Sequence, residues 1–324
     1  MTPYINRRAM LSGIVGAPLA VTAARAQSDW PNRPVRLIIP SAAGGAADFI
    51  GRTLGRFLEP HLRQPVVVDN RPGAGGITGT EAAKQSAPDG YTFLIATNST
   101  HAANEFLYRR LPYDPVKDFA HIGMLGTFAT IAVVPNEAPF KSIPALIAHA
   151  RANPGKVFFG YYSSSSLVPS ALLKARADLD ITGAAYRNIT QILPDLISGQ
   201  IQFAFLDTLS AQPALQSGRV VPIAVSSPQR WALLPEVPTV AEAVPDFVVQ
   251  GWFGVTAPVG TPQPILARMQ GLLQQAVADA TFAEAVTRQG LTPGFMDAAA
   301  MDRFIAEDRL RWREWVRIAG IEPE

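Results

Sequence analysis

Hydrophobic residues along this chain gather in short runs of strand length that alternate with segments of helical periodicity. The first clear run is 35–40, and apolar residues then recur at helical spacing over 49–62. Parallel strands need a long crossover connection, which is usually a helix. The alternation therefore predicts an α/β fold with mainly parallel strands.

Further strands are expected where short apolar runs end in turn residues. These runs are 66–68, 91–96, 157–161, 201–206, 220–225 and 252–257, with two strand-like pieces within 122–135 around Gly126 and Thr127. Helices are expected where apolar residues recur every three or four positions. These segments contain 81–84, 142–152, 172–173, 192–197, 265–280 and 301–319.

The most informative segment is the loop after the first strand, which has the sequence SAAGGAAD over 41–48. Backbone N–H groups at the start of a helix have no intrahelical partner, and together with the helix dipole they favour an anion. Gly44 and Gly45 lack a Cβ atom and allow a ligand to approach closely. The loop predicts a site that holds an anion without transforming it.

Catalytic and metal-binding patterns are weak by comparison. The chain has no Cys and no Gly-x-Ser-x-Gly elbow, and its histidines lack metal-ligand spacing. These are His61, His101, His121 and His149. The Gly-rich segment 73–80 lacks the Lys of a Walker motif, which favours a tight turn against the sheet over nucleotide binding. We expect no catalytic residue, no metal and no cofactor.

The N-terminus has the pattern of an export signal. Arg7 and Arg8 precede a short apolar segment, and Ala24-Arg25-Ala26 matches a signal-peptidase site, so residues 1–26 are predicted to be cleaved after Ala26. The paired arginines are compatible with either a twin-arginine or an ordinary secretory leader. Both routes predict a periplasmic protein.

Removing the leader changes the charge of the chain. The full sequence has 28 basic and 26 acidic residues, but three arginines and no acid lie in the leader. The mature chain therefore has a formal charge of about −1, which does not favour nucleic acid as a partner. An exported chain without Cys has no disulfides, so its core alone must stabilise the fold.

Many ordered sequence blocks resemble the substrate-binding proteins of tripartite tricarboxylate transporters, also called the Bug family of periplasmic solute receptors. The blocks are RPVRLIIP at 33–40, GGAAD at 44–48, VVVDNRPGAGG at 66–76, APDGYT at 87–92, LPYDPVKDF at 111–119, PEVPT at 235–239 with Glu242, WFG at 252–254 and APVGTP at 257–262. They extend through nearly all of the mature chain.

The resemblance implies a type II periplasmic-binding-protein fold, in which two α/β lobes close around a cleft like a Venus flytrap. With crossings near 126–130 and 250–254, lobe 1 would comprise 27–127 and 253–324, and lobe 2 would comprise 128–252. Closure would need only two hinge segments.

The resemblance also implies a function. The protein would be a monomeric receptor that captures a small carboxylate (a mono-, di- or aromatic acid, or an amino acid) for delivery to a membrane permease. A receptor that signals to a membrane sensor kinase is the alternative. A hydrolase or isomerase of small acids has less support, since no base with an orienting partner is evident.

Candidate ligand-binding residues follow the expected strands in both lobes. In lobe 1 they are Ser41, Ala42, Gly44, Gly45, Asp48, Gly75, Thr97, Asn98 and Ser99, and in lobe 2 they are Tyr161, Ser163, Ser164, Ser165 and Asp207. Asp48 either braces its loop or faces the ligand. The lobe 2 loop departs from the family, because serines replace the usual glycines and Tyr161 and Tyr162 stand beside them.

Overall fold

The computed structural model describes residues 30–187, 189–231 and 233–323, so the expected leader at 1–26 lies outside the described residues. The strands in this part of the chain are β1 Val35–Ile39, β2 Val66–Asn70, β3 Thr92–Thr97, β4 Phe119–Pro135, β5 Val157–Tyr161, β6 Ile181–Ala185, β7 Phe203–Asp207, β8 Val220–Val225, β9 Gln250–Pro258 and β10 Leu291–Asp297. Most of them lie within a few residues of an expected apolar run.

Helices alternate with these strands, as the hydrophobic pattern predicts. They are α2 Ala46–Leu62, α3 Ile77–Lys84, α4 Asn104–Leu107, α5 Ile143–Ala152, α6 Ser164–Arg176, α7 Ile189–Ile197, α8 Thr208–Gln216, α9 Gln263–Ala278, α10 Ala280–Thr287 and α11 Ala298–Ala319. Short helical turns complete the set: η1 Ala74–Gly76, η2 Ser99–Ala103 and η3 Val240–Glu242. No helix of the described residues is long and apolar enough to cross a membrane.

The strands form one sheet in the order β2-β1-β3-β9-β4-β7-β5-β6, with β8 and β10 also paired to β4. In the first half of the molecule, β1 pairs in parallel with β2 and β3, and β9 joins β3 to β4 with antiparallel pairing. In the second half, β5 pairs in parallel with β6 and β7, while β7 and β8 are antiparallel to β4. Each half therefore combines strands that pair in parallel with further strands that pair in antiparallel fashion.

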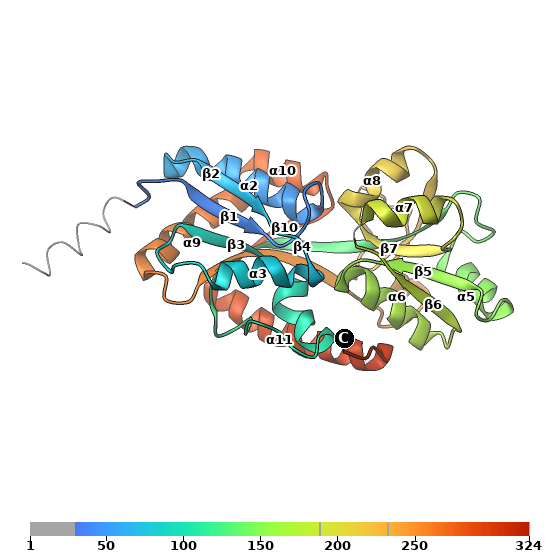
Figure 1. The fold of residues 1–324 in the computed structure, drawn as a ribbon. Helices are drawn as coiled ribbons and strands as arrows, with labels where there is room; N and C mark the ends of the chain where they lie inside the picture. Colours follow the sequence, from blue (N-terminus) through green and yellow to red (C-terminus); the bar gives the residue numbers. More distant parts are fainter. Residues whose placement is uncertain (1–29, 188, 232, 324) are drawn as a thin grey trace, which may run out of the picture.

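Strand β4 connects the two halves (Figure 1). Up to Ala129 it pairs with β9, and from Thr130 it pairs with β7 in the second half. The two strand-like pieces expected around Gly126 are therefore one continuous strand of 17 residues. Gly126 is required within it, because its φ is +154° and a Cβ atom there would lie 2.3 Å from the carbonyl oxygen of Thr292.

Several hydrophobic clusters stabilise the fold. Leu37, Leu54 and Phe93 pack with Val255 in the first half, and the second half has its own clusters on both faces of its strands. Helix α11 extends below both halves in Figure 1. Its first turns pack with Trp252, whereas Trp312 and Val316 near its end belong to a cluster of the second half.

The buried carboxylate of Asp308 links α11 to the connecting strand β9. Its Oδ2 accepts hydrogen bonds from the indole N–H groups of Trp252 at 2.8 Å and Trp312 at 3.1 Å. Both indole rings are almost completely buried. The other oxygen of Asp308, Oδ1, accepts from Arg311 Nε at 3.2 Å, so the buried carboxylate pairs three donors that would otherwise lose a partner.

We expect Asp308→Ala to lower the free energy of unfolding by about 2–4 kcal/mol, because it leaves two buried indole N–H groups unpaired and removes the ion-pair partner of Arg311. Chemical denaturation monitored by tryptophan fluorescence would measure the loss. Asp308→Asn keeps an acceptor oxygen and should cost less than half as much. Equal losses in the two variants would contradict the hydrogen-bonding explanation.

Candidate functional site

The candidate site is the boundary between the two halves, which we call the crevice, where the carboxyl ends of the parallel strands of both halves lead into helices. In the first half, α2 begins after β1, η1 after β2 and η2 after β3, and in the second half α6 begins after β5 and α8 after β7. The N–H groups of each first turn lack intrahelical acceptors. Ligands of open α/β sheets bind beyond the carboxyl ends of the strands.

Two side-chain hydrogen bonds join the halves on one side of this crevice. The Nδ2 of Asn98 donates to the Ser165 hydroxyl at 3.0 Å, and the hydroxyls of Ser99 and Ser164 lie 2.6 Å apart. Asn98 and Ser99 follow β3, whereas Ser164 and Ser165 are the first residues of α6. The structure thus brings together four of the predicted site residues from opposite halves.

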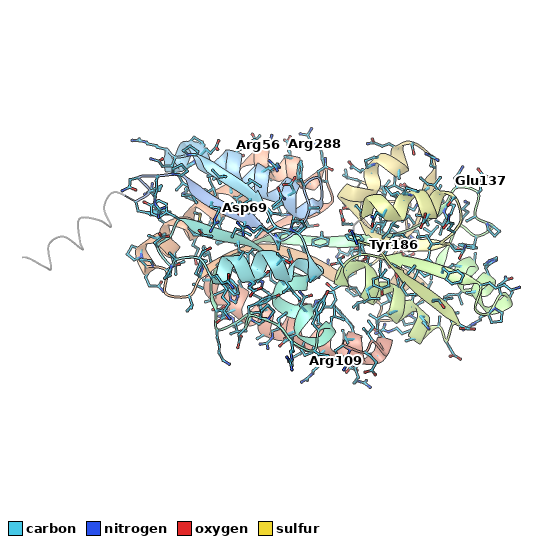
Figure 2. The ribbon with its side chains drawn as sticks, viewed as in Figure 1. Arg56, Asp69, Arg109, Glu137, Tyr186 and Arg288 are labelled. Carbon is cyan, nitrogen blue, oxygen red and sulfur yellow. The ribbon has the colours of Figure 1, made fainter. Side chains whose placement is uncertain are left out.

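On the other side, α8 of the second half contacts the turn between α10 and β10. The Thr208 hydroxyl donates to the carbonyl of Gln289, and the Gln212 side chain donates to the carbonyl of Arg288, both at 2.9 Å. The Arg288 side chain itself lies at the outer edge of the molecule (Figure 2). A Cβ atom at Gly290 would lie 1.7 Å from the Thr208 hydroxyl, so the contact requires glycine.

Asp48 braces the β1–α2 loop. Its carboxylate accepts from the Gly44 N–H at 2.9 Å and from Arg52 Nε at 2.9 Å, and the residue is 5% exposed. Burial raises the pKa of Asp48, but hydrogen bonds from Arg52, Gly44 and Asn70 lower it by more, so the net pKa lies below the usual range. These contacts explain the loop conformation, and ligand binding by Asp48 stays a prediction.

The remaining residues of the β1–α2 loop contribute backbone groups and one hydroxyl, that of Ser41. Gly45 has an extended backbone and is the N-cap of α2, and Ala42 and Gly44 are exposed. The Ser41 hydroxyl is buried and has no hydrogen-bond partner. A buried hydroxyl of this kind is unusual unless a ligand or a water pairs with it.

Thr97 and Gly75 mainly shape the neighbouring loops. The Thr97 hydroxyl accepts from the Thr100 N–H at 3.2 Å, which closes the turn into η2. Gly75 has a φ of 60°, and its carbonyl accepts from the Asn104 side chain at 3.1 Å. Their predicted ligand contacts are not tested by this geometry.

In the second half, Ser163 caps α6. The Ser166 hydroxyl accepts from the N–H groups of Tyr162 at 2.9 Å and Ser163 at 3.0 Å, which fixes the loop. Tyr161 is half-buried with its ring 6.1 Å from that of Phe159. The serines of this loop therefore serve both as a helix cap and as contacts to the first half.

Sequence reasoning left the role of Tyr162 open, and the structure gives it a partner. The Tyr162 hydroxyl donates to Oδ2 of Asp207, and its ring packs against the cluster around Ile192. Burial raises the pKa of Tyr162 well above its ordinary value, and the Asp207 charge raises it further. The hydroxyl is therefore a hydrogen-bond donor at neutral pH, and Asp207 is held at the end of β7.

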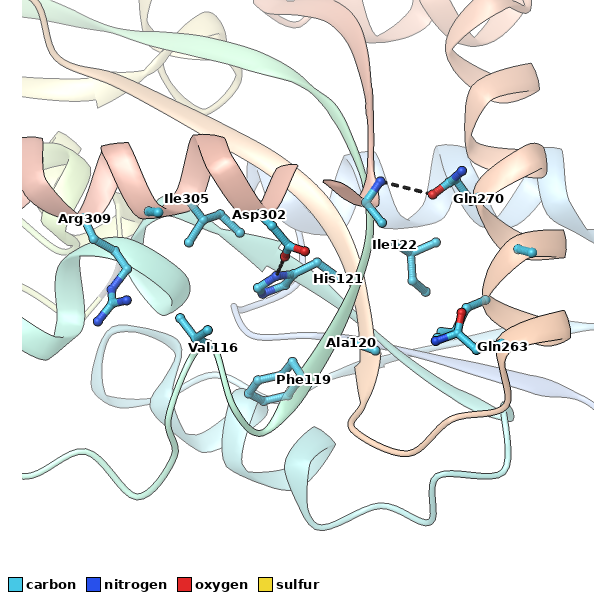
Figure 3. A pocket seen from close by; sticks show the side chains of 14 residues that line it. Val116, Phe119, Ala120, His121, Ile122, Gln263, Gln270, Asp302, Ile305 and Arg309 are labelled. Atoms are coloured by element: carbon cyan, nitrogen blue, oxygen red, sulfur yellow. Dashed lines mark hydrogen bonds and ion pairs between the residues drawn. The ribbon is translucent and has the colours of Figure 1, made fainter. Parts of the chain in front are cut away.

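A larger groove, of about 770 Å³, lies outside the crevice between the start of β4, α9 and α11 (Figure 3). In it, His121 Nδ1 lies 2.6 Å from an Asp302 oxygen, and Gln270 accepts from the Ala298 N–H. None of the predicted site residues lines this groove. Among the described residues, no group of three or more His, Cys, Asp or Glu side chains could hold a metal ion.

We expect Asp48→Asn to reduce the free energy of unfolding by about 1–2 kcal/mol at pH 7, because the loop loses a charge-assisted acceptor. The folded pKa of Asp48 is depressed, so this contribution exists above the unfolded pKa near 4 and disappears as the pH falls through the folded value. Denaturation curves at several pH values should show the difference between the two proteins closing toward pH 3. The exposed Asp180→Asn is the control, and an equal effect there would contradict the assignment.

Comparisons with known proteins agree with the geometry. Residues 50–321 match the family model described as "Tripartite tricarboxylate transporter family receptor". The protein BugT of Bordetella pertussis is 32% identical over 320 residues, which cover 98% of this chain and 98% of BugT.

Two solved structures show the same fold. The R. palustris protein Rpa4515 with adipate superimposes with a TM-score of 0.88 at 30% identity, covering 91% of this chain and 100% of that one. MatC from Rhodopseudomonas palustris with bound malate has a TM-score of 0.81 at 26% identity, covering 89% of this chain and 100% of MatC. The predicted family resemblance and the predicted α/β periplasmic-binding-protein fold are confirmed.

Proposed function

Because the chain belongs to the tripartite tricarboxylate transporter receptor family, we propose that it captures a small carboxylate in the crevice between its halves and releases it unchanged. The observation that carries the proposal is that helical segments from both halves begin at this crevice. Similar proteins have adipate and malate as ligands, and both are carboxylates.

The binding energy would come from backbone N–H groups and hydroxyls. One helix N-terminus contributes roughly 0.3–2 kcal/mol toward an anion, so several must act together. The first turns of α2 and α6 offer such donors, and the unpaired Ser41 hydroxyl is placed at the end of β1. Such a site holds a charge without supplying a nucleophile or a base.

The two halves would act as the two lobes of the receptor, with boundaries at 127/128 and 252/253. The pairing of β4 changes between Ala129 and Thr130, which supports a hinge close to the first boundary. The end of α11 packs on the second lobe, so this helix would follow or restrain the closing motion. A rotation at two connecting strands is a common form of domain closure.

We further propose that the mature protein is a periplasmic monomer, cleaved after Ala26, that delivers its ligand to the permease of a tripartite transporter. Residues 7–26 of the sequence have the composition of an exported leader. The family description names a transporter receptor, which favours a permease over a sensor kinase as the partner.

We expect the purified mature protein to show a higher melting temperature with one or a few carboxylates, because a ligand that binds only the folded state stabilises it by mass action. A panel of mono-, di-, aromatic and amino acids would be screened by thermal shift. Mass spectrometry of the released ligand should find it unchanged. Conversion of the ligand to a product would contradict the receptor assignment.

We expect Gly45→Val to weaken carboxylate binding at least about 100-fold while preserving the fold, because branched methyl groups would occupy the space over the α2 N-terminus. A Cβ atom at Gly45 has no neighbour closer than 3.7 Å, so the protein itself tolerates it. Isothermal titration calorimetry would measure affinity. The control is Gly294→Val, on β10, where a Cβ atom meets nothing within 4 Å. Unchanged affinity in Gly45→Val would remove this loop from the site.

A further inference from the structure

The sequence block LPYDPVKDF, residues 111–119, lies between α4 and β4 and contains none of the predicted site residues. Lys84, the last residue of α3, anchors this block at two places. Its ammonium group donates to the Pro112 carbonyl at 2.9 Å and lies 2.9 Å from the Asp118 carboxylate. Between these anchors, the side chain of Tyr113 is almost completely buried.

Tyr113 and Asn104 form one buried chain of hydrogen bonds. The Tyr113 hydroxyl donates to the Thr100 carbonyl at 2.9 Å and accepts from Asn104 Nδ2 at 3.4 Å. The same Nδ2 atom donates to the Gly75 carbonyl at 3.1 Å. A carbonyl oxygen can only accept, so the amide nitrogen must face Gly75 and the hydroxyl hydrogen must face Thr100. Each donor of the chain therefore has its acceptor.

This chain links the two loops that follow β2 and β3 in the first half. Gly75 lies in η1 and Thr100 in η2, whereas the donors come from the start of α4 and from the block 111–119. The loops also touch directly, because a Cβ atom at Gly76 would lie 2.8 Å from Cγ2 of Thr100. Burial raises the pKa of Tyr113 above its usual value, so the hydroxyl keeps its proton at neutral pH.

Both acceptors are main-chain carbonyl groups, whose oxygens would repel an anion in the crevice. Gly75 has a φ of 60°, and a glycine in such a loop can turn its peptide group at little steric cost. The Asn104 amide removes this freedom, because it holds the Gly75 oxygen against a buried side chain. Tyr113 holds the Thr100 oxygen in the same way. Loops that are ordered before binding cost the ligand less conformational entropy.

We propose that Asn104 and Tyr113 are positioning residues of the carboxylate site. They hold two loop carbonyls inside the protein and so fix the loops after β2 and β3 in the arrangement that binds the ligand. Neither side chain needs to touch the ligand for this role. The inference rests on the proposed function, because these loops carry the predicted ligand-binding residues Gly75 and 97–99.

Tyr113→Phe removes the hydroxyl and keeps the ring, so the Thr100 carbonyl loses its donor. We expect binding to weaken at least about tenfold. Calorimetry would measure the affinity, with adipate and malate as the first probes and the rest of the carboxylate panel after them. The control is Tyr91→Phe, which removes a hydroxyl bonded to Asn32 at the other end of β3 and should leave the affinity unchanged.

Asn104→Leu removes both amide bonds and should weaken binding at least as much as Tyr113→Phe. Because the two side chains act through one chain of bonds, the double variant should lose no more than about the larger single loss. In the ligand-free protein, hydrogen exchange over 73–80 and 97–101 should be faster in each variant. A general loss of stability would instead speed exchange throughout the fold.

Several outcomes would overturn the proposal. If both single variants keep the affinity of the unaltered protein, or if their losses add in full, the positioning role is wrong while carboxylate capture stands. If no acid of the panel binds the unaltered protein, the proposed function fails and the positioning role fails with it. Melting curves would show whether each variant is folded, and if one is not, the other decides.

Discussion

The orientation of helix N-termini toward one crevice is the constraint on which the rest of the structure depends. In a parallel set every strand ends at the same edge, so each following helix begins there with unpaired N–H groups. Strands β4 and β9 then place two such edges opposite each other. The positive ends of the helices would repel one another without an anion or hydrogen bonds between them.

Side chains at the crevice reduce this repulsion between helix N-termini in different ways. Asp48 uses its carboxylate on Gly44 and Arg52, so its charge stabilises one loop near the start of α2. Asp207 lies at the start of α8 and accepts from Tyr162. Both carboxylates are almost fully buried, which makes their hydrogen-bond partners essential.

The sequence predicted the repeating units well, because strands such as β1 and β7 are short runs of apolar residues with clear ends. It missed β6 and β10, whose sequences ITGAA and LTPGFMD contain glycine, proline and exposed positions. Their strand structure comes from pairing with β5 and β4. The Tyr162–Asp207 bond was also missed, since it joins residues far apart in the sequence.

The serines of the second half form hydrogen bonds to the first half. Ser164 and Ser165 bond directly to Ser99 and Asn98, whereas glycines at the same positions have no side chain to do so. In the proposed receptor, these bonds would favour a closed arrangement of the two lobes with or without a ligand. A ligand can shift a conformational equilibrium only by its difference in affinity for the two states, and apparent affinity rises with the population of the competent state. In such a receptor the serine loop would therefore lower the contribution that the ligand itself must make to closure.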